Sequence, residues 1–93
     1  MKVYISSSLG KKIKKFKKKL KLELDNEIRK IIESPSIGSE KKGDLRGVFV
    51  HKFKTANTLF LLSYRMVEEG IELITLGPHE NYYRELKSYL KNR

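Results

Sequence analysis

The sequence predicts one α+β domain, in which an N-terminal helical hairpin and a C-terminal helix pack on a twisted antiparallel β-sheet in the order β-α-α-β-β-β-α. Two observations support this fold class: apolar residues recur every three or four positions in the first third of the chain, and they alternate with a period of two in the second half. With 93 residues, of which 39% are hydrophobic, the chain is long enough for one core. We therefore expect a single domain over residues 1–93.

The first third of the chain is predicted to be helical and amphipathic. One of the serines at 6–8 can cap its start, and "SPS" at 34–36 ends it, because the residue before a proline is pushed out of the helical region. Alternation in "KLKLELD" indicates a break near 19–21, so a hairpin of two helices is favoured over one long helix. The preceding "KVYI" is predicted to be a short edge strand. The apolar stripe consists of Leu9, Ile13, Phe16, Leu20, Leu24, Ile28 and Ile31.

The second half of the chain is predicted to be a three-stranded meander followed by a helix. Residues 37–47 hold three glycines and no periodicity, so we expect a loop there. Strands are predicted at 48–54, 58–67 and 71–76, and their short connections imply antiparallel pairing. The last segment places Tyr82, Tyr83, Leu86, Tyr89 and Leu90 on one helical face, which is expected to pack against the sheet.

The register of the first hairpin decides which side chains share a face of the sheet. A turn with an even number of loop residues places Lys52 beside Leu61 and Lys54 beside Leu59. Arg65 then lies on their face, whereas an odd turn reverses the arrangement. We prefer the even turn, because it separates the cations from the apolar face. These three cations are then predicted to form a phosphate-binding surface, with a solvated outer sheet face as the alternative.

Charge is the strongest compositional feature. The chain has 21 Lys and Arg against 11 Asp and Glu, a net charge of +10. A polyanionic partner is the natural inference, because clustered cations release condensed counterions from phosphates. Acidic lipid surfaces, an acidic protein and a merely solvated surface are the alternatives. Seven lysines lie in "KKIKKFKKK" at 11–19. The residues predicted to bind nucleic acid are Lys14, Lys15, Lys18, Lys42 and Arg46; the last can reach a phosphate or pair with Asp44.

Several classes of site are excluded by the residues that are missing. There is no cysteine, so disulfides, thiolate zinc sites and cysteine nucleophiles are ruled out, and a reducing, cytoplasmic location is expected. Two histidines and no tight acidic cluster argue against a metal site. No phosphate-binding glycine loop or serine hydrolase elbow occurs, and no cofactor is expected. No apolar run reaches the length of a membrane span, so no membrane association is expected.

The stretch "LGPHENYYRELK" contains the best candidates for acid–base chemistry. RNA cleavage without a metal needs a base for the 2′-hydroxyl, cations for the phosphate and an acid for the leaving oxygen. His79 lies one helical turn before Tyr83, and its imidazole can exchange a proton near neutral pH. An exposed residue in the first turn after Pro78 is the alternative. Tyr83 can stack on a nucleobase or complete the core, and Glu80 is a weaker candidate base.

The second histidine, His51, is interpreted differently. It lies between Phe49 and Phe53 on the apolar face of its strand, so we expect a packed, hydrogen-bonded histidine rather than a catalyst.

The stretches "PSIGSEKKGDLRGVFVHKFK", "LFLLSYR" and "ELITLGPHENYYRELK" resemble the RelE/ParE superfamily of toxins from bacterial type II toxin–antitoxin modules. The resemblance covers essentially the whole chain and is closest to small ParE-like members. It implies a helical hairpin on a twisted antiparallel sheet with a C-terminal helix. It also implies a cognate antitoxin that wraps the toxin with an acidic, amphipathic segment. Members of the RelE type cleave mRNA in the ribosomal A site, and members of the ParE type poison DNA gyrase.

The resemblance also supports two members of the expected catalytic set, to which the hairpin register adds three cations. RelE-type enzymes often have a His or Arg near this point with an aromatic residue four positions on, which His79 and Tyr83 match. The expected set comprises His79, Tyr83, Arg65, Lys52 and Lys54. Many RelE-type nucleases also have an arginine just after the first hairpin turn, where this chain has Leu61.

The expected function is therefore that of a toxin that cleaves mRNA on the ribosome without a metal and is neutralised by its antitoxin. Two alternatives stay open: ParE-type inhibition of DNA gyrase, and a non-catalytic basic module that binds its antitoxin and reaches operator DNA only through that complex.

Overall fold

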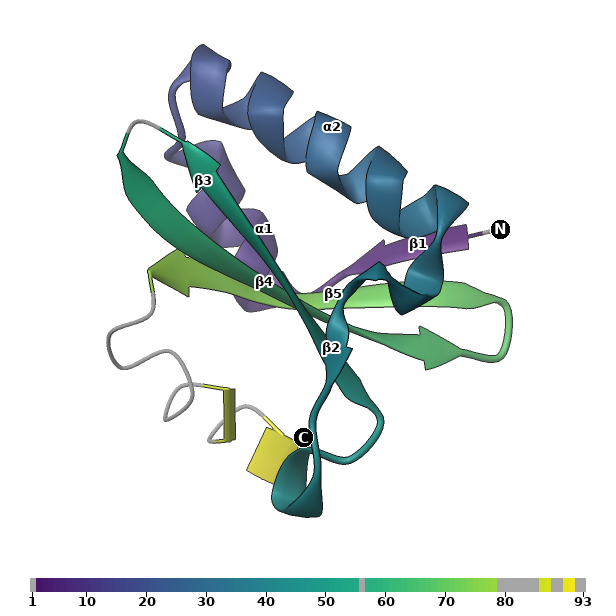
Figure 1. Ribbon diagram of the computed structural model, residues 1–93. Helices are drawn as coiled ribbons and strands as arrows, with labels where there is room; N and C mark the ends of the chain where they lie inside the picture. Colours follow the sequence, from purple (N-terminus) through teal and green to yellow (C-terminus); the bar gives the residue numbers. More distant parts are fainter. Residues whose placement is uncertain (1, 56, 79–85, 88–89, 92–93) are drawn as a thin grey trace.

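A five-stranded mixed sheet forms the centre of the structure, with the strand order β1-β5-β4-β3-β2 (Figure 1). The computed structural model describes residues 2–55, 57–78, 86–87 and 90–91. The strands are β1 (Lys2–Ile5), β2 (Ser39–Glu40), β3 (Val48–Thr55), β4 (Thr58–Val67) and β5 (Gly70–Pro78). The predicted meander is confirmed, because β3 pairs antiparallel with β4 and β4 with β5.

The edges of the sheet differ from the prediction of a purely antiparallel sheet. β1 is an edge strand as predicted, but it pairs parallel with β5, with Lys2 opposite Gly70 and Ile5 opposite Leu73. A side chain at Gly70 would not fit, because a Cβ atom there would lie 1.9 Å from the carbonyl oxygen of Lys2. On the other edge, β2 lies within the predicted loop and pairs with β3. Periodicity within a strand does not encode the direction of a partner so distant in sequence.

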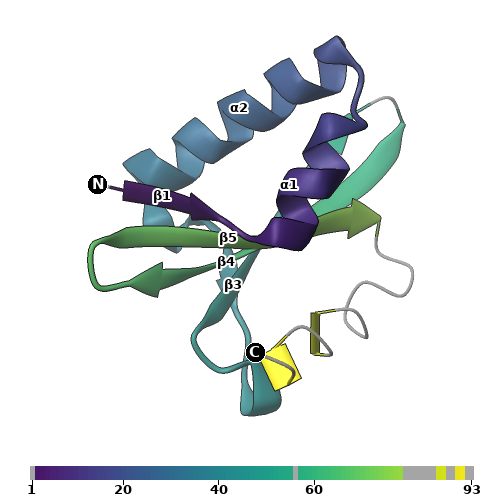
Figure 2. The same ribbon diagram turned by 180° about the vertical axis from the view of Figure 1, so that it is seen from behind.

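Two helices, α1 (Ser7–Lys14) and α2 (Lys18–Glu33), form the predicted hairpin and cover one face of the sheet (Figure 2). Ser6 caps α1, because its Oγ accepts from the Leu9 amide at 3.1 Å and donates to the Ile74 carbonyl at 2.6 Å. The break lies at 15–17, earlier than the predicted 19–21. Residue Pro35 begins a 3-10 turn, η1 (Pro35–Ile37), and so ends α2 as predicted.

The two faces of the sheet have separate cores. Leu9, Leu24 and Ile31 from the helices pack with Phe53, Leu62, Tyr64, Ile71, Leu73 and Leu76. The opposite core consists of Leu45, Val48, Val50, Leu61, Ile74 and Leu86, with Leu90 packed against it. The helical C-terminal residues that are described, 86–87 and 90–91, therefore pack on the face opposite α1 and α2, whereas the sequence predicted one helical layer. The rest of the predicted C-terminal helix lies outside the described residues.

A β-bulge in the pairing of β4 with β5 sets how β5 ends. The register shifts between Ser63 and Tyr64, and the Ser63 hydroxyl bridges the gap by accepting from the Thr75 amide at 3.2 Å and donating to the Thr75 carbonyl at 3.3 Å. Lys12 of α1 donates to the Leu76 carbonyl at 3.1 Å. The end of β5 is thereby fixed to both its neighbouring strand and the first helix. Within the part of the chain described here, no helix has the length and apolarity needed to cross a membrane.

Candidate functional site

Two exposed lysines lie side by side on β3. Lys52 is opposite Leu61 and Lys54 is opposite Leu59, which is the predicted register. Both lysines are exposed, and Leu59, which is opposite Lys54, is 42% exposed. Residues two apart on a strand point to the same side about 7 Å apart, so their ammonium groups can contact one phosphate or two successive ones.

The end of β5 is separated from this pair of lysines by one strand, β4. Gly77 is opposite Leu61, and Pro78 is opposite Phe60. β5 therefore ends at Pro78, which pairs with Phe60. The residue before Phe60 on β4 is Leu59, which pairs with Lys54. His79, Glu80 and Tyr83, which follow in the sequence, lie outside the described residues.

Arg65 occupies the other end of β4. It shares the face of Lys52 as predicted, but it pairs with Val48 and lies four residues from Leu61, about 13 Å along the strand. Its Nε donates to Glu72 Oε1 at 2.6 Å, an ion pair whose side chains are 28% and 12% exposed. Arg65 and Lys52 therefore do not converge on one phosphate in this conformation.

The other predicted nucleic-acid contacts fall into two groups. Lys42 and Arg46 flank a second 3-10 turn, η2 (Gly43–Leu45), before β3 begins, and both are exposed. They lie at the end of β3 remote from Lys54. The lysines at 14, 15 and 18 are exposed at the connection between α1 and α2. That connection lies beside the β3–β4 hairpin end in both ribbon views (Figures 1 and 2).

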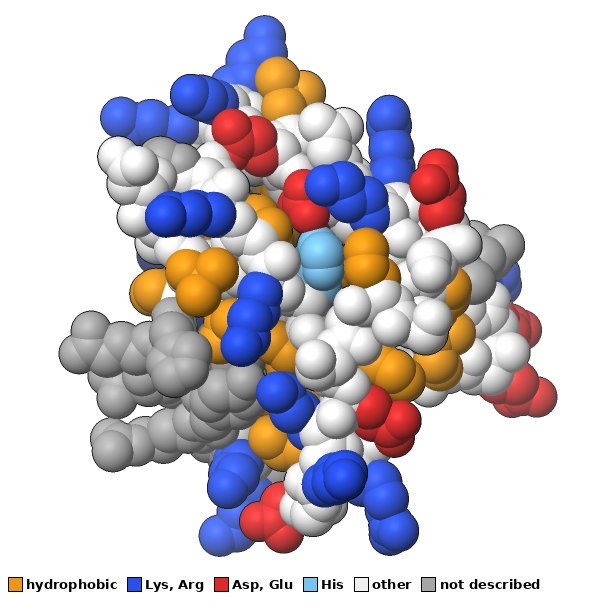
Figure 3. Space-filling view, viewed as in Figure 1, with side chains coloured by type: hydrophobic (Ala, Val, Ile, Leu, Met, Phe, Trp, Pro, Cys, Tyr) orange, Lys and Arg blue, Asp and Glu red, His pale blue; other side chains and the backbone are white. Residues whose placement is uncertain are grey.

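The hairpin end is one of two basic regions of the visible surface, and the other is at the lower end of the view in Figure 3. Figure 3 shows basic side chains over the upper left of the molecule, where α2 begins and the β3–β4 hairpin ends, with exposed hydrophobic side chains between them. Apolar surface flanked by cations suits a nucleic acid, because bases stack on apolar side chains while phosphates contact the cations.

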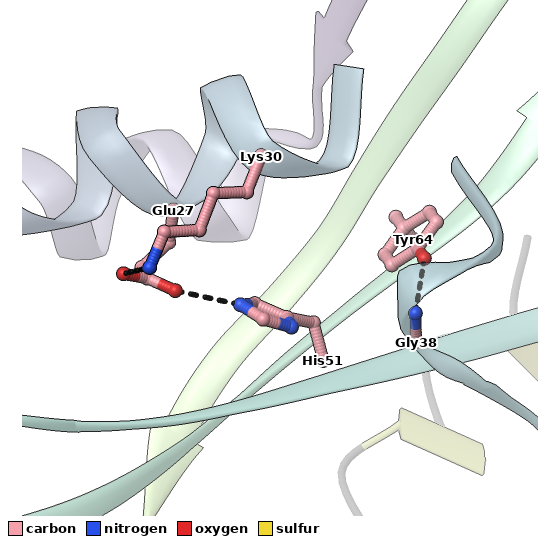
Figure 4. A network of polar contacts seen from close by, with 5 residues as sticks. All are labelled: Glu27, Lys30, Gly38, His51 and Tyr64. Carbon is pink, nitrogen blue, oxygen red and sulfur yellow. Dashed lines mark hydrogen bonds and ion pairs between the residues drawn. The ribbon is translucent and has the colours of Figure 1, made fainter. Parts of the chain in front are cut away.

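His51 is hydrogen-bonded to Glu27 of α2, and both side chains are largely buried (Figure 4). Its Nε2 lies 2.7 Å from Glu27 Oε1, and its ring stacks on Phe53 with centroids 6.0 Å apart. Lys30 contacts the other Glu27 oxygen at 3.0 Å. Burial raises the pKa of Glu27, but the contacts with His51 and Lys30 outweigh it and hold that pKa below its usual value of 4.5. The predicted packed, hydrogen-bonded histidine is what the structure contains.

Tyr64 ties the loop after α2 to the sheet (Figure 4). Its hydroxyl donates to the Pro35 carbonyl at 2.6 Å and accepts from the Gly38 amide at 3.0 Å. Its ring stacks on Phe49 with centroids 5.5 Å apart. Burial of the hydroxyl raises the pKa of Tyr64, an effect that the Gly38 hydrogen bond partly offsets. Tyr64 is therefore a neutral structural group.

Sequence reasoning missed the acidic residues on the buried side of α2. At 100° per residue, Glu27 falls within about 20° of Leu20, at the centre of the apolar stripe. Glu23 is one turn earlier, and its Oε2 is buried without a hydrogen-bond partner in the described part of the chain. The position of an acidic residue on the apolar stripe could have indicated a buried polar contact, because a charged group needs a partner when it is buried. Among the described residues, no three His, Cys, Asp or Glu side chains are grouped so that they could hold a metal ion.

Comparison with known proteins identifies relatives of this chain. The family model described as "ParE-like toxin of type II bacterial toxin-antitoxin system" matches residues 3–87. A search of curated proteins gives no match.

The fold is also found in solved structures. A double mutant of E. coli RelE in the free state superposes with a TM-score of 0.72 at 16% identity, covering 96% of this chain and 94% of that chain. The intact E. coli RelBE toxin–antitoxin complex gives a TM-score of 0.67 at 19% identity, covering 84% of this chain and 95% of the matched chain. The isolated E. coli RelE toxin gives 0.63 at 20% identity, covering 92% and 95%.

Proposed function

The chain belongs to the ParE-like toxins of type II bacterial toxin–antitoxin systems, and we propose that it inhibits translation by cleaving mRNA on the ribosome. The chemistry needs a proton acceptor for the 2′-hydroxyl, cations for the phosphate and a proton donor for the leaving 5′-oxygen. The observation that carries the proposal is the strand register: Lys52 and Lys54 are exposed on one face, and across β4 from them β5 ends at Pro78, the residue before His79.

Each proposed residue has a distinct role. Lys52 and Lys54 hold the scissile phosphate and neutralise the charge that builds on it in the transition state. His79 exchanges a proton with the 2′-hydroxyl or the leaving oxygen, and Tyr83 stacks on a neighbouring base. Arg65, which is held by Glu72, is an outer member of the set and contacts the substrate backbone away from the scissile bond.

The proposal is tested by translation in a purified cell-free system, with primer extension on the mRNA. Wild-type protein should produce cuts within codons, and His79→Ala should reduce them by about 100-fold or more, the usual contribution of a general acid or base. Removal of either Lys52 or Lys54 should reduce cleavage by roughly 100-fold, as loss of a transition-state donor does.

Lys21→Ala is the matched control, since Lys21 is an exposed lysine on α2, which covers the sheet face opposite to that of Lys52 and Lys54. It should leave the cuts unchanged. Cuts that persist undiminished in Lys52→Ala and Lys54→Ala would rule out the proposed site, and undisturbed translation with wild-type protein would rule out the nuclease.

A cognate antitoxin is the second part of the proposal. The E. coli RelBE structure is a toxin–antitoxin complex, and the fold is shared over most of both chains. We propose that an acidic, amphipathic segment of an antitoxin binds this basic toxin and neutralises it, and that operator DNA is contacted only through that complex. Co-expression of the neighbouring open reading frame should restore growth, and the two chains should co-purify.

Inhibition of DNA gyrase is the alternative, and one observation favours it. Leu61, opposite Lys52, is fully buried in the core, so the hairpin has no cation where many RelE-type nucleases have an arginine. A gyrase inhibitor needs a binding surface and no acid–base pair. Growth inhibition that survives His79→Ala, together with loss of gyrase supercoiling activity in vitro, would establish this alternative over the nuclease.

A further inference from the structure

A narrow groove separates the start of α2 from the end of the β3–β4 hairpin. Its volume is about 210 Å³, and almost all of its surface is apolar. Leu20 of α2 and Phe60 of β4 line it, and Phe60 is held by stacking on Phe53, with ring centroids 5.8 Å apart. We call this the hairpin groove. It lies on the helix-covered face, whereas Lys52 and Lys54 point to the opposite face of the same hairpin.

Two lysines stand at the rim of the hairpin groove. Lys17 and Lys19 line it, and both residues are exposed. Since the surface of the groove is nearly all apolar, these lysines contribute their aliphatic stems and leave the ammonium groups at the edge. The rim is therefore positively charged while the interior is apolar.

The wall of the groove also holds an unsatisfied acceptor. Glu23 lines the groove, and its Oε2 is buried with no hydrogen-bond partner among the residues that the structure describes. A carboxylate oxygen that is removed from water without a donor is unfavourable, and a donor brought by a ligand relieves that cost. The groove thus selects a ligand that is flat or apolar, presents an N–H group and is linked to negative charge.

We propose that the hairpin groove binds an unpaired nucleobase with an exocyclic amine, such as cytosine, from a single-stranded RNA. The base packs between Leu20 and Phe60, its amine donates to Glu23 as the carboxylate turns toward it, and the adjoining phosphates contact Lys17 and Lys19. An acidic peptide would also suit the rim and could donate to Glu23 through its backbone amides, but a nucleobase combines the donor with a flat ring that packs between Leu20 and Phe60. This inference rests on the proposed function only in taking RNA as the physiological ligand.

The groove and the proposed catalytic lysines occupy opposite faces of one hairpin end. A single strand that passes over the end of the hairpin can contact both, with one nucleotide anchored in the groove and another phosphate on Lys52 and Lys54. The groove would then position RNA without touching the bond that is cleaved.

The test measures fluorescence anisotropy of two labelled 2′-O-methyl hexanucleotides, one of cytidine and one of uridine, with the full-length protein. The 2′-O-methyl group prevents cleavage, so the result does not depend on whether the nuclease proposal is correct. Cytosine and uracil have the same ring size but differ in the amine that Glu23 is proposed to accept. We expect the cytidine oligonucleotide to bind about tenfold more tightly, in the range of a well-formed base contact.

Matched variants separate the contributions. Glu23→Gln keeps the side-chain shape, but its amide can pair with either base, so the preference for cytidine should disappear. Lys17→Ala with Lys19→Ala should weaken both oligonucleotides equally and leave the preference intact. Thermal unfolding of each variant checks that the fold is retained.

Three results would overturn the proposal. Equal or undetectable binding of the two oligonucleotides by wild-type protein would show that the hairpin groove does not select a base with an exocyclic amine. A cytidine preference that persists in Glu23→Gln would place the selective contact elsewhere. Binding of a leucine-containing acidic peptide that is abolished by Phe60→Ala, with no base preference in wild type, would assign the groove to a protein partner.

Discussion

At the scale of single residues, the pair of His51 and Glu27 gives a pH-dependent contribution to stability. The pKa of Glu27 lies below its usual value of 4.5 in the folded protein, so the ionised carboxylate stabilises the fold. That contribution is complete above pH 4.5 and is lost as the pH falls through the lowered pKa. Glu27→Gln removes it, and we expect the variant to be less stable than wild type by about 1.5 kcal/mol at neutral pH, the lower end of the range for a hydrogen bond to a charged group.

The measurement is urea unfolding of both proteins between pH 7 and pH 3. The two stability curves should converge below pH 4.5. Protonation of Glu27 removes the contribution of its ionised carboxylate from wild type, and the Glu27→Gln variant lacks that contribution at every pH. Glu33→Gln is the control, since Glu33 is an exposed carboxylate on the same helix. Wild-type and Glu27→Gln curves that stay parallel over the whole range would contradict the assignment.

At the scale of elements, Gly38 shows how closely the loop after α2 is packed on the sheet. A Cβ atom at Gly38 would lie 2.8 Å from the Tyr64 hydroxyl oxygen and 3.0 Å from the Val50 carbonyl oxygen. Gly38→Ala must therefore displace the hydroxyl that joins Pro35 to the sheet. We expect a loss of roughly 2 kcal/mol in the free energy of unfolding, the cost of leaving buried polar groups unpaired.

Gly10→Ala is the matched substitution for this prediction. It lies in α1 with nothing within 4 Å of the added Cβ, so it should stabilise the protein, by up to about 1 kcal/mol, through helix propensity. Thermal unfolding of the two variants should therefore shift in opposite directions. A Gly38→Ala variant as stable as wild type would mean that the loop moves away from Tyr64 without cost.

The sequence predicted the pairing of neighbouring elements but not the contacts between elements that are distant in the chain. Alternation along the strands predicted the register of Lys52 and Lys54, because only one register keeps cations out of the apolar face. The parallel pairing of β1 was not predictable, since it joins Val3 to Ile71 across most of the chain. The partner of His51 was missed for a similar reason: it comes from another element, and only the acidic residue on the stripe of α2 hinted at it.

At the scale of the whole molecule, the net charge of +10 is distributed unevenly, and the distribution decides which surface contacts a polyanion. Three exposed lysines, Lys14, Lys15 and Lys18, lie at the α1–α2 connection, whereas Lys42 and Arg46 lie at the far end of β3. If the first group contacts phosphates, its replacement by glutamate removes counterion release. The slope of log Kd against log salt for single-stranded RNA should then fall by about 2, close to 0.7 for each phosphate that is no longer neutralised.

The variant with Lys42→Glu and Arg46→Glu provides the comparison, because it reverses charges on the remote surface. A binding surface localised at the hairpin end predicts a large change in slope for the lysine triple variant and a small one for this double variant. Equal changes per reversed charge would instead show that the whole molecule attracts RNA through its net field, with no preferred surface. An unchanged slope in the triple variant would assign those lysines to solubility or to the antitoxin, since salt dependence reports only the cations that displace ions from the phosphates.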